Sequence, residues 1–203
     1  LSGLLSRDAL LPLAATAAGL GSFPPVQTVA DPETAPERFR GADAGIEGDG
    51  KALAAGERLA VQLGLTPVRI PAAAKAAYHA GATIVANYTV ALVGMAVRLA
   101  EEAGVPAEVA ARIYLPLLHG AAVNLDRLAP AVALTGAIRR GDAGTVSAHL
   151  AALSAADRVL YAVVGLVHVF LRKPFLEITN DPEGAKARGR KVFWWDFLFY
   201  ATF

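Results

Sequence analysis

The sequence predicts an α/β segment followed by a mainly α-helical domain. Up to about residue 70, stretches with apolar residues at helical spacing alternate with short apolar runs bounded by glycine and proline, as in part of an α/β sheet. From Ala72 onward these strand signals stop, and long segments of helical spacing follow. The length of 203 residues fits one large domain or two small ones, and the change in pattern favours two.

The α/β segment, residues 1–71, is expected to contain short helices and strands separated by turns. Helices are predicted where apolar residues recur at helical spacing, and strands where a short apolar run ends at turn residues. In chain order we expect a helix over 6–19 that starts near Ser6 or Asp8, proline-rich turns over 20–41, a buried strand within 43–50, a helix over 50–64 that closes on Gly64, and a strand over 65–71 that ends at Pro71.

The helical domain, residues 72–165, is expected to hold long helices joined by a polar loop. Proline within a helix removes a backbone donor and crowds the preceding turn, so Pro116 is expected to kink or break its helix. In chain order we expect helices over 73–102, ending at Gly104, over 106–130, and over 143–165, after Asp142.

Residues 166–203 change in character and are expected to form an atypical, aromatic-rich tail. Both tryptophans and most of the phenylalanines fall there, and alanine becomes scarce.

The composition excludes several classes of site. The chain has no cysteine, which excludes disulfides, zinc–thiolate sites, iron–sulfur clusters and cysteine nucleophiles. Its formal charge is +1 without a dense Lys/Arg cluster, so no nucleic-acid partner is expected. His149 and His168 are too far apart in sequence to suggest a metal pair, and no metal site is expected. We expect a cytoplasmic protein.

The longest uncharged run, residues 76–97, is long enough to span a bilayer. It contains His79, Asn87 and two threonines and is dominated by alanine, which favours a buried helix. We therefore expect no membrane partner, and a small membrane-associated protein is the alternative.

Polar residues recur every four positions along this predicted helix, at Lys75, His79, Thr83 and Asn87. With 3.6 residues per turn they form a stripe on an otherwise apolar helix, expected to be buried with the stripe facing a cleft or a polar partner. Lys75 or His79 could donate a proton to a developing alkoxide, and Asn87 could orient a substrate carboxylate or carboxamide. The alternatives are that Lys75 reaches solvent and that His79 is a hydrogen-bonded structural residue.

The polar loop after Pro130 holds a second group of candidates. Asp142 is expected to cap the next helix by accepting backbone N–H bonds from Gly144 or Thr145. Arg140, beside Arg139, is suited to bidentate capture of a carboxylate or phosphate, and a solvated surface arginine is the alternative. Thr135 could supply a hydroxyl.

One more polar candidate lies on the second predicted helix, where Asn124 could bind substrate or bond a neighbouring helix end.

Four separated stretches, in order over roughly residues 1–162, resemble a bacterial family of Rossmann-like proteins whose C-terminal domain is the domain of unknown function 2520. That domain is similar to the helical domains of 6-phosphogluconate dehydrogenase, ketopantoate reductase and pyrroline-carboxylate reductase relatives. The stretches are "SGLLSRDALLPLAATAAGLGSFPPVQTVADPE", "KAAYHAGATIVANYTVAL", "LPLLHGAAVNL" and "ALTGAIRRGDAGTVSAHLAAL".

The resemblance implies an NADP-type dinucleotide fold, a substrate site between two domains, and a homodimer formed through the helical domain. It also implies cofactor-binding roles for Ser2, Gly3 and Ser22. The positions that match the family's other motifs are Lys75, Tyr78, His79, Asn87, Asn124, Thr135, Gly136, Arg140, Gly141 and Asp142.

The chain departs from the family's pattern at several places. Pro24 stands where the family usually has histidine, and Ala137 where it usually has proline. Related dehydrogenases place an asparagine one turn after the lysine, where this chain has His79. The phosphate-binding glycine motif is expected to lie before Leu1, so the chain is expected to be an N-terminally truncated fragment with only the last part of a Rossmann sheet.

Taken together, these features predict an NADP-dependent oxidoreductase that reduces a small 2-oxo or imino acid of the ketopantoate type, with Lys75 and His79 as catalytic residues. Substrate binding is assigned to Asn87, Thr135, Arg140 and Asn124. The truncated form is expected to hold no dinucleotide by itself and could be inactive. The alternative is a non-catalytic helical module for dimerisation or ligand binding.

Overall fold

The structure is a computed structural model, and it describes residues 3–170. The chain folds as two compact units, of which one ends at Ala111 and the other begins at Arg112. The predicted domain boundary at residue 71 lies inside the first unit. Most of the predicted tail lies outside the described residues.

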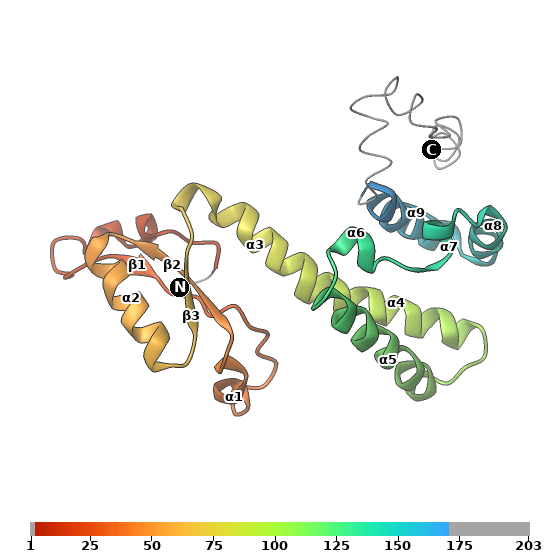
Figure 1. Cartoon of the computed structure of the whole chain (residues 1–203), viewed down its shortest axis with the longest axis horizontal. Helices are drawn as coiled ribbons and strands as arrows, with labels where there is room; N and C mark the ends of the chain where they lie inside the picture. The colour runs from red at the N-terminus through yellow and green to blue at the C-terminus, as the bar shows by residue number, and fades with distance from the viewer. Residues whose placement is uncertain (1–2, 171–203) are drawn as a thin grey trace, which may run out of the picture. The chain divides into compact units, whose positions relative to one another are not determined.

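A small sheet forms the centre of the first unit (Figure 1). Among the described residues it has three strands in the order β1 (Gly21–Ser22), β2 (Asp43–Gly48) and β3 (Thr66–Arg69). Strand β1 pairs antiparallel with β2, and β3 pairs parallel with β2. The parallel pair is connected by helix α2 (Gly50–Gln62), which gives the β–α–β arrangement of an α/β fold.

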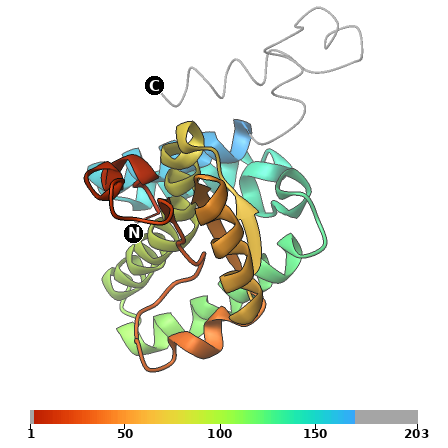
Figure 2. The ribbon, with the colours of Figure 1, turned by 90° about the vertical axis from the view of Figure 1, so that its left-hand side faces the viewer.

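Helix α2 covers one face of this sheet in two views at right angles (Figures 1 and 2). Successive side chains of a strand point to opposite faces, so Ala44 and Ile46 point to the same side. That side packs on α2, where Ala44 and Ala60 are fully buried and Ile46 lies next to Gly56. The alternation in β2 therefore creates the apolar core, as the sequence predicts for a buried strand.

The other face of β2 is where polar groups lie. Gly45 and Glu47 point to this side, and a Cβ on Gly45 would lie 3.2 Å from the Tyr78 hydroxyl oxygen. Tyr78 belongs to helix α3 (Lys75–Thr83). The sheet thus lies between α2 and the first turns of α3.

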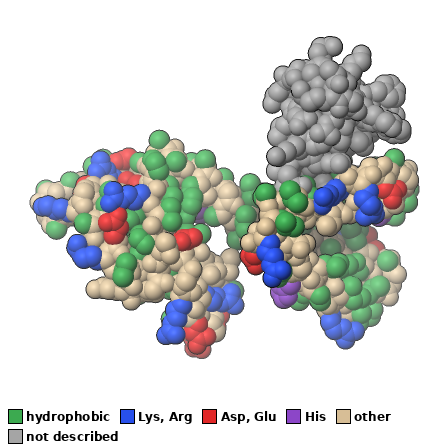
Figure 3. Space-filling view, in the orientation of Figure 1, with side chains coloured by type: hydrophobic (Ala, Val, Ile, Leu, Met, Phe, Trp, Pro, Cys, Tyr) green, Lys and Arg blue, Asp and Glu red, His purple; other side chains and the backbone are tan. Residues whose placement is uncertain are grey.

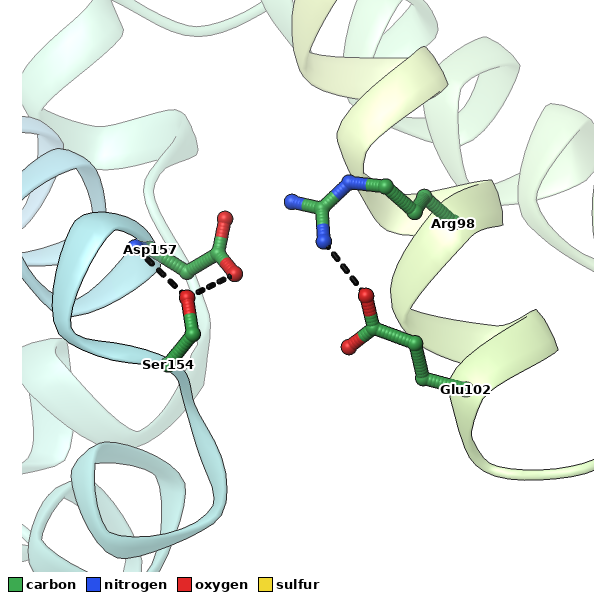
Figure 4. A network of polar contacts seen from close by, with 4 residues as sticks. All are labelled: Arg98, Glu102, Ser154 and Asp157. Carbon is green, nitrogen blue, oxygen red and sulfur yellow. Dashed lines mark hydrogen bonds and ion pairs between the residues drawn. The ribbon is translucent and has the colours of Figure 1, made fainter.

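The helix predicted over 73–102 is present as one continuous helical segment. A 3-10 turn (Ala72–Ala74) leads into α3, a π-helical turn (η3, Ile84–Tyr88) follows, and α4 (Thr89–Glu102) completes it. Gly104 has φ 87° directly after its end, which confirms the predicted stop. Near that end Arg98 and Glu102 form an ion pair of 2.6 Å, one turn apart (Figure 4).

The expectation that this helix is buried is not met within the first unit. Val85 is 74% exposed and Val90 is 72% exposed. The segment Ala72–Glu102 is long and apolar enough to cross a membrane by length and composition, which is weak evidence when one such helix stands alone. In the monomer, the sheet covers only the beginning of the helix.

The predicted helix over 6–19 is wrong in type and length. Residues Arg7–Leu13 form a 3-10 helix that Ser6 caps by accepting the Asp8 N–H, as expected for its start. Pro12 lies inside it and has no N–H to donate to an α-helical ladder. A short helix, α1 (Ala35–Phe39), lies within the stretch predicted as turns.

The second unit is helical, as predicted. Its described helices are α5 (Ala107–Leu125, which begins before the unit boundary), α6 (Pro130–Ala133), α7 (Gly136–Arg140), α8 (Ala143–Ala152) and α9 (Ala155–Phe170). Pro116 does not break α5, because one missing N–H costs the helix a single bond while its other bonds remain.

The single helix predicted over 143–165 is two helices. Ser154 begins α9: its hydroxyl oxygen accepts the Asp157 N–H at 3.2 Å, and the hydroxyl donates to the Asp157 carboxylate (Figure 4). The bond from the Asp157 N–H is an N-cap bond, which favours a new helix start.

Candidate functional site

The first residue of α3 is a buried lysine. Lys75 is 3% exposed, because the 3-10 turn after Pro71 brings the start of α3 against the polar face of the sheet. Its Nζ donates to the Ser22 hydroxyl oxygen at 2.6 Å. Ser22 lies on β1 and is 6% exposed. The structure therefore joins Lys75, predicted to be catalytic, to Ser22, predicted to bind the cofactor.

Strand pairing adds a buried carboxylate. Glu47 lies opposite Ser22 in the β1–β2 register and is 6% exposed. Its Oε2 lies 3.5 Å from the Ser22 hydroxyl and accepts the Arg7 backbone N–H at 2.8 Å. We refer to Lys75, Ser22 and Glu47 as the Lys75 cluster.

The Lys75 cluster leaves hydrogen-bonding capacity unused. An ammonium has three N–H donors, and only the bond to Ser22 is present among residues 3–170. A buried donor without a partner is costly, so a site of this kind favours a ligand that brings an acceptor. A carbonyl or carboxylate oxygen is such an acceptor.

His79 lies one helical turn after Lys75 and is half-buried. It lies against the N-terminal segment: a Cβ on Gly3 would come within 2.8 Å of its Nδ1. Gly3 is thus needed for this close approach, and the cofactor contact predicted for it stays a prediction. Ser2 lies outside the described residues.

Tyr78 borders the Lys75 cluster on the same face of the sheet. Burial, and secondarily the negative charge of Asp43, raise the pKa of the Tyr78 hydroxyl above its ordinary value of 10.0. The hydroxyl is therefore a neutral donor over the physiological range.

Asn87 is not part of the Lys75 cluster. It lies in the π-helical turn, is exposed, and is about 18 Å along the helix axis from Lys75. The polar stripe is therefore divided: Lys75 is buried against the sheet, His79 and Thr83 are half-buried, and Asn87 is open to solvent.

The remaining predicted site residues belong to the second unit. Asn124 is exposed in the last turn of α5, and Thr135, also exposed, precedes α7 without a capping hydrogen bond. Arg140 is exposed at the end of α7. Arg139 instead donates to the backbone oxygens of Val132 and Leu134, where it satisfies the end of α6.

Asp142 caps α8, as predicted. Its carboxylate accepts the Thr145 N–H at 3.0 Å and the Thr145 hydroxyl at 2.7 Å. These bonds, with the side-chain bond the larger, hold the pKa of Asp142 below its ordinary value of 3.8. Its role is therefore to start a helix.

The turn from β2 into α2 does not suit a dinucleotide phosphate. Such phosphates sit on free N–H groups at a helix N-terminus in Rossmann-type folds. Here the Asp49 carboxylate accepts the N–H groups of Lys51 and Ala52 at 3.0 Å each and that of Leu20 at 2.7 Å. Ser22 is already bonded to Lys75. The described residues therefore offer no phosphate site at this turn.

The described residues thus form part of a Rossmann-like sheet, with the Lys75 cluster on its polar face, followed by a helical domain. A family model described as domain of unknown function DUF2520 matches residues 43–167, and the chain belongs to this family. None of the curated proteins matches the chain.

Two solved structures are similar over most of the chain. One is the "putative NADP oxidoreductase BF3122" from Bacteroides fragilis, with TM-score 0.67 and 21% identity over 82% of this chain and 62% of that one. The other is protein TM1727 from Thermotoga maritima, with TM-score 0.61 and 26% identity over 93% of this chain and 68% of that one. The chain thus spans 62% of the length of the Bacteroides protein. The predicted fold class is confirmed.

Glu47 is the residue that sequence reasoning missed. It stands in "GIEGDG", where the acidic residues indicate a turn after a strand. Its position in the strand's alternation, on the side opposite Ala44 and Ile46, was the signal that could have found it.

Proposed function

We propose that the chain is an oxidoreductase-like protein that acts on a small 2-oxo or imino acid, of the ketopantoate type, with Lys75 as the proton donor. The observation that carries this proposal is a lysine that is 97% buried and has one hydrogen bond among the described residues. The family membership and the fold are compatible with it, and the name of the Bacteroides protein supports the reaction type.

Lys75 would bind the substrate oxygen or nitrogen and give it a proton as negative charge develops there. His79, one turn further along α3 and half-buried, is the second candidate for this role. Anchoring of the substrate carboxylate by Asn87, Arg140, Thr135 or Asn124 stays a prediction.

NADP is the cofactor proposed for the complete protein, and when bound it would supply the hydride. Its phosphates would have to be held by groups other than the α2 N-terminus, because Asp49 fills that position. A homodimer in the cytoplasm remains the proposed setting.

The test is the oxidation of NADPH by the complete protein with a panel of 2-oxo and imino acids, together with NADPH binding by calorimetry. Lys75→Met is expected to lower kcat about 10²–10⁴-fold, since it removes a proton donor. Lys51→Met is the matched control, because Lys51 is exposed at the start of α2. Equal turnover by Lys75→Met and wild type would reject the role of Lys75, and an absence of NADPH binding and turnover in the folded complete protein would reject the oxidoreductase.

The second candidate function is a non-catalytic helical module for dimerisation or ligand binding. The apolar side chains left exposed on η3 and α4 favour it, and hydrophobic surface is visible on this helix in Figure 3. Turnover lost in Lys75→Met would exclude it. A membrane-associated chain is the third, tested by whether the chain partitions into detergent.

A further inference from the structure

The buried amine and the buried carboxylate of the Lys75 cluster bind the same hydroxyl. Ser22 Oγ lies 2.6 Å from Lys75 Nζ and 3.5 Å from Glu47 Oε2. Within the described part of the chain, Lys75 Nζ and the Glu47 carboxylate oxygens lie too far apart, at more than 4.0 Å, for a direct ion pair. The hydroxyl of Ser22 is thus the link between the two groups.

The chemistry of the three groups fixes the direction of these hydrogen bonds. An ammonium can only donate, so the Ser22 oxygen accepts from Lys75, and the single hydroxyl proton is left for Glu47. The carboxylate is itself held by the Arg7 N–H. A chain of contacts therefore runs from the backbone of Arg7 through Glu47 and Ser22 to the Lys75 amine.

Besides its contact with the Ser22 hydroxyl, Glu47 places a negative charge near the Lys75 ammonium. A buried ammonium is costly unless an opposite charge or several hydrogen bonds compensate it. Because both groups reach the same hydroxyl, Nζ and Oε2 are at most about 6 Å apart, close enough to interact strongly in a buried site.

We propose that Glu47, acting through the Ser22 hydroxyl, is a positioning residue for Lys75. The carboxylate orients the hydroxyl, and the hydroxyl holds the ammonium by one N–H, so that the other two remain free for a substrate. Only the identity of that substrate rests on the proposed function, because the positioning is a property of the chain without ligand.

The test observes the Lys75 ammonium directly. The chain has five lysines, so protein labelled with ¹⁵N-lysine gives few ammonium signals, and Lys75→Met identifies the one from Lys75. Glu47→Gln and Ser22→Ala are each expected to make hydrogen exchange of this ammonium about tenfold faster, because each loosens its hydrogen bond. Ser22→Thr keeps a hydroxyl and is expected to retain the wild-type exchange rate.

Glu57→Gln is the matched control. Glu57 is a carboxylate on α2 that pairs with Arg69 at 2.6 Å, away from the Lys75 cluster. It is expected to leave the exchange of Lys75 unchanged. Since the hydrogen-bonded part of the Glu47 effect passes through Ser22 and only its charge acts directly, adding Glu47→Gln to Ser22→Ala is expected to speed exchange by much less than Glu47→Gln does alone.

Two results would overturn the proposal: an unchanged Lys75 signal in folded Glu47→Gln, or a double variant in which the full effects of Glu47→Gln and Ser22→Ala add. Circular dichroism establishes that each variant is folded. If Glu47→Gln does not fold, Glu47→Asp replaces it, because it keeps the charge but withdraws the carboxylate from Ser22 and is expected to speed exchange in the same direction.

These measurements need no substrate, so they decide the positioning role whether or not the chain reduces an oxo or imino acid. Where turnover is found, Glu47→Gln is expected to lower kcat about tenfold with little change in KM, and Glu57→Gln to change neither. A fall in kcat without any change in Lys75 exchange would contradict positioning.

Discussion

Asp49 is an aspartate that serves its fold by accepting backbone N–H groups. Its carboxylate satisfies the start of α2 and also fixes the residue before β1 through the Leu20 N–H. The bonds from Leu20 and Ala52, in that order, hold the pKa of Asp49 below its ordinary value of 3.8. One side chain thus joins the helix to the strand that carries Ser22.

This lowered pKa predicts how stability depends on pH. The folded state favours the ionised carboxylate, so its stabilisation is fully present above pH 3.8 and is lost as the pH falls below 3.8 through the folded pKa. Asp49→Asn is therefore expected to lower Tm at neutral pH, with a difference from wild type that shrinks in acid. Thermal unfolding followed by circular dichroism measures it.

Asp126→Asn is the control for this prediction, because Asp126 is an exposed aspartate just after α5. It is expected to leave Tm at neutral pH unchanged. A Tm difference for Asp49→Asn that stays constant from neutral pH into acid would contradict the assigned pKa.

At the scale of single residues, the sequence predicted an interaction correctly where the partner lies only a few positions away in the chain. The cap at Asp142 was predicted because its partner, Thr145, is three positions away. Lys75 and Ser22 were each singled out, but their bond was not, because 53 positions separate them. Glu47 was missed because its partner is 25 positions away across an antiparallel pair whose register no local pattern reveals.

Among the elements, β1 is held unusually close to its neighbours. A Cβ on Gly21 would lie 2.7 Å from the Glu47 carbonyl oxygen and 2.8 Å from the Ala52 Cβ. Gly21→Ala is therefore expected to lower the free energy of unfolding by about 1–3 kcal/mol, since backbone must move to admit the methyl group. Urea unfolding measures the loss.

Gly50→Ala is the matched control, because nothing lies within 4 Å of the Cβ it would add at the start of α2. It is expected to be neutral or to stabilise by up to about 1 kcal/mol, as alanine favours helix. Equal losses in both variants would contradict the close approach of β1.

The break between α8 and α9 gives a third prediction. Ser154→Ala removes the side chain that accepts the Asp157 N–H and is expected to cost about 1 kcal/mol of unfolding free energy. Ser147→Ala, at an exposed position within α8, is expected to change it by less than about 0.5 kcal/mol. Denaturant titration compares the two, and no difference between them would argue for one uninterrupted helix.

Helices and strands whose apolar residues recur with a clear period were predicted well. Those whose existence or bounds depend on one or two residues, or on pairing, were not. Helix α2 and strands β2 and β3 follow from their apolar spacing and from Gly64. Strand β1 has only two residues, and its pairing rather than its own pattern makes it a strand. The α8–α9 break was missed because alanine and leucine keep helical spacing through it, although Ser154 signalled an N-cap.

At the scale of the whole molecule, the long helix formed by α3, η3 and α4 leaves apolar surface exposed to water, which is energetically costly. Large apolar side chains are open along its middle, with Ile84 56%, Val85 74% and Val90 72% exposed. Large apolar side chains are exposed on α5 and α9 as well, and a contiguous patch of such side chains marks an interaction surface more often than single ones do. The predicted homodimer would cover this surface, whereas a membrane would cover it with lipid.

Val85→Glu separates these possibilities. If copies of the chain associate through this helix, a buried unpaired carboxylate is costly, and the dissociation constant is expected to rise at least about tenfold. Sedimentation equilibrium measures it.

Val61→Glu is the matched control, because Val61 is 71% exposed on α2 in the same unit, and it is expected to leave the dissociation constant unchanged. A wild-type chain that stays monomeric at all concentrations, or equal weakening by both variants, would reject dimerisation through the helix. Partition of the wild type, but not of Val85→Glu, into detergent would instead favour the membrane.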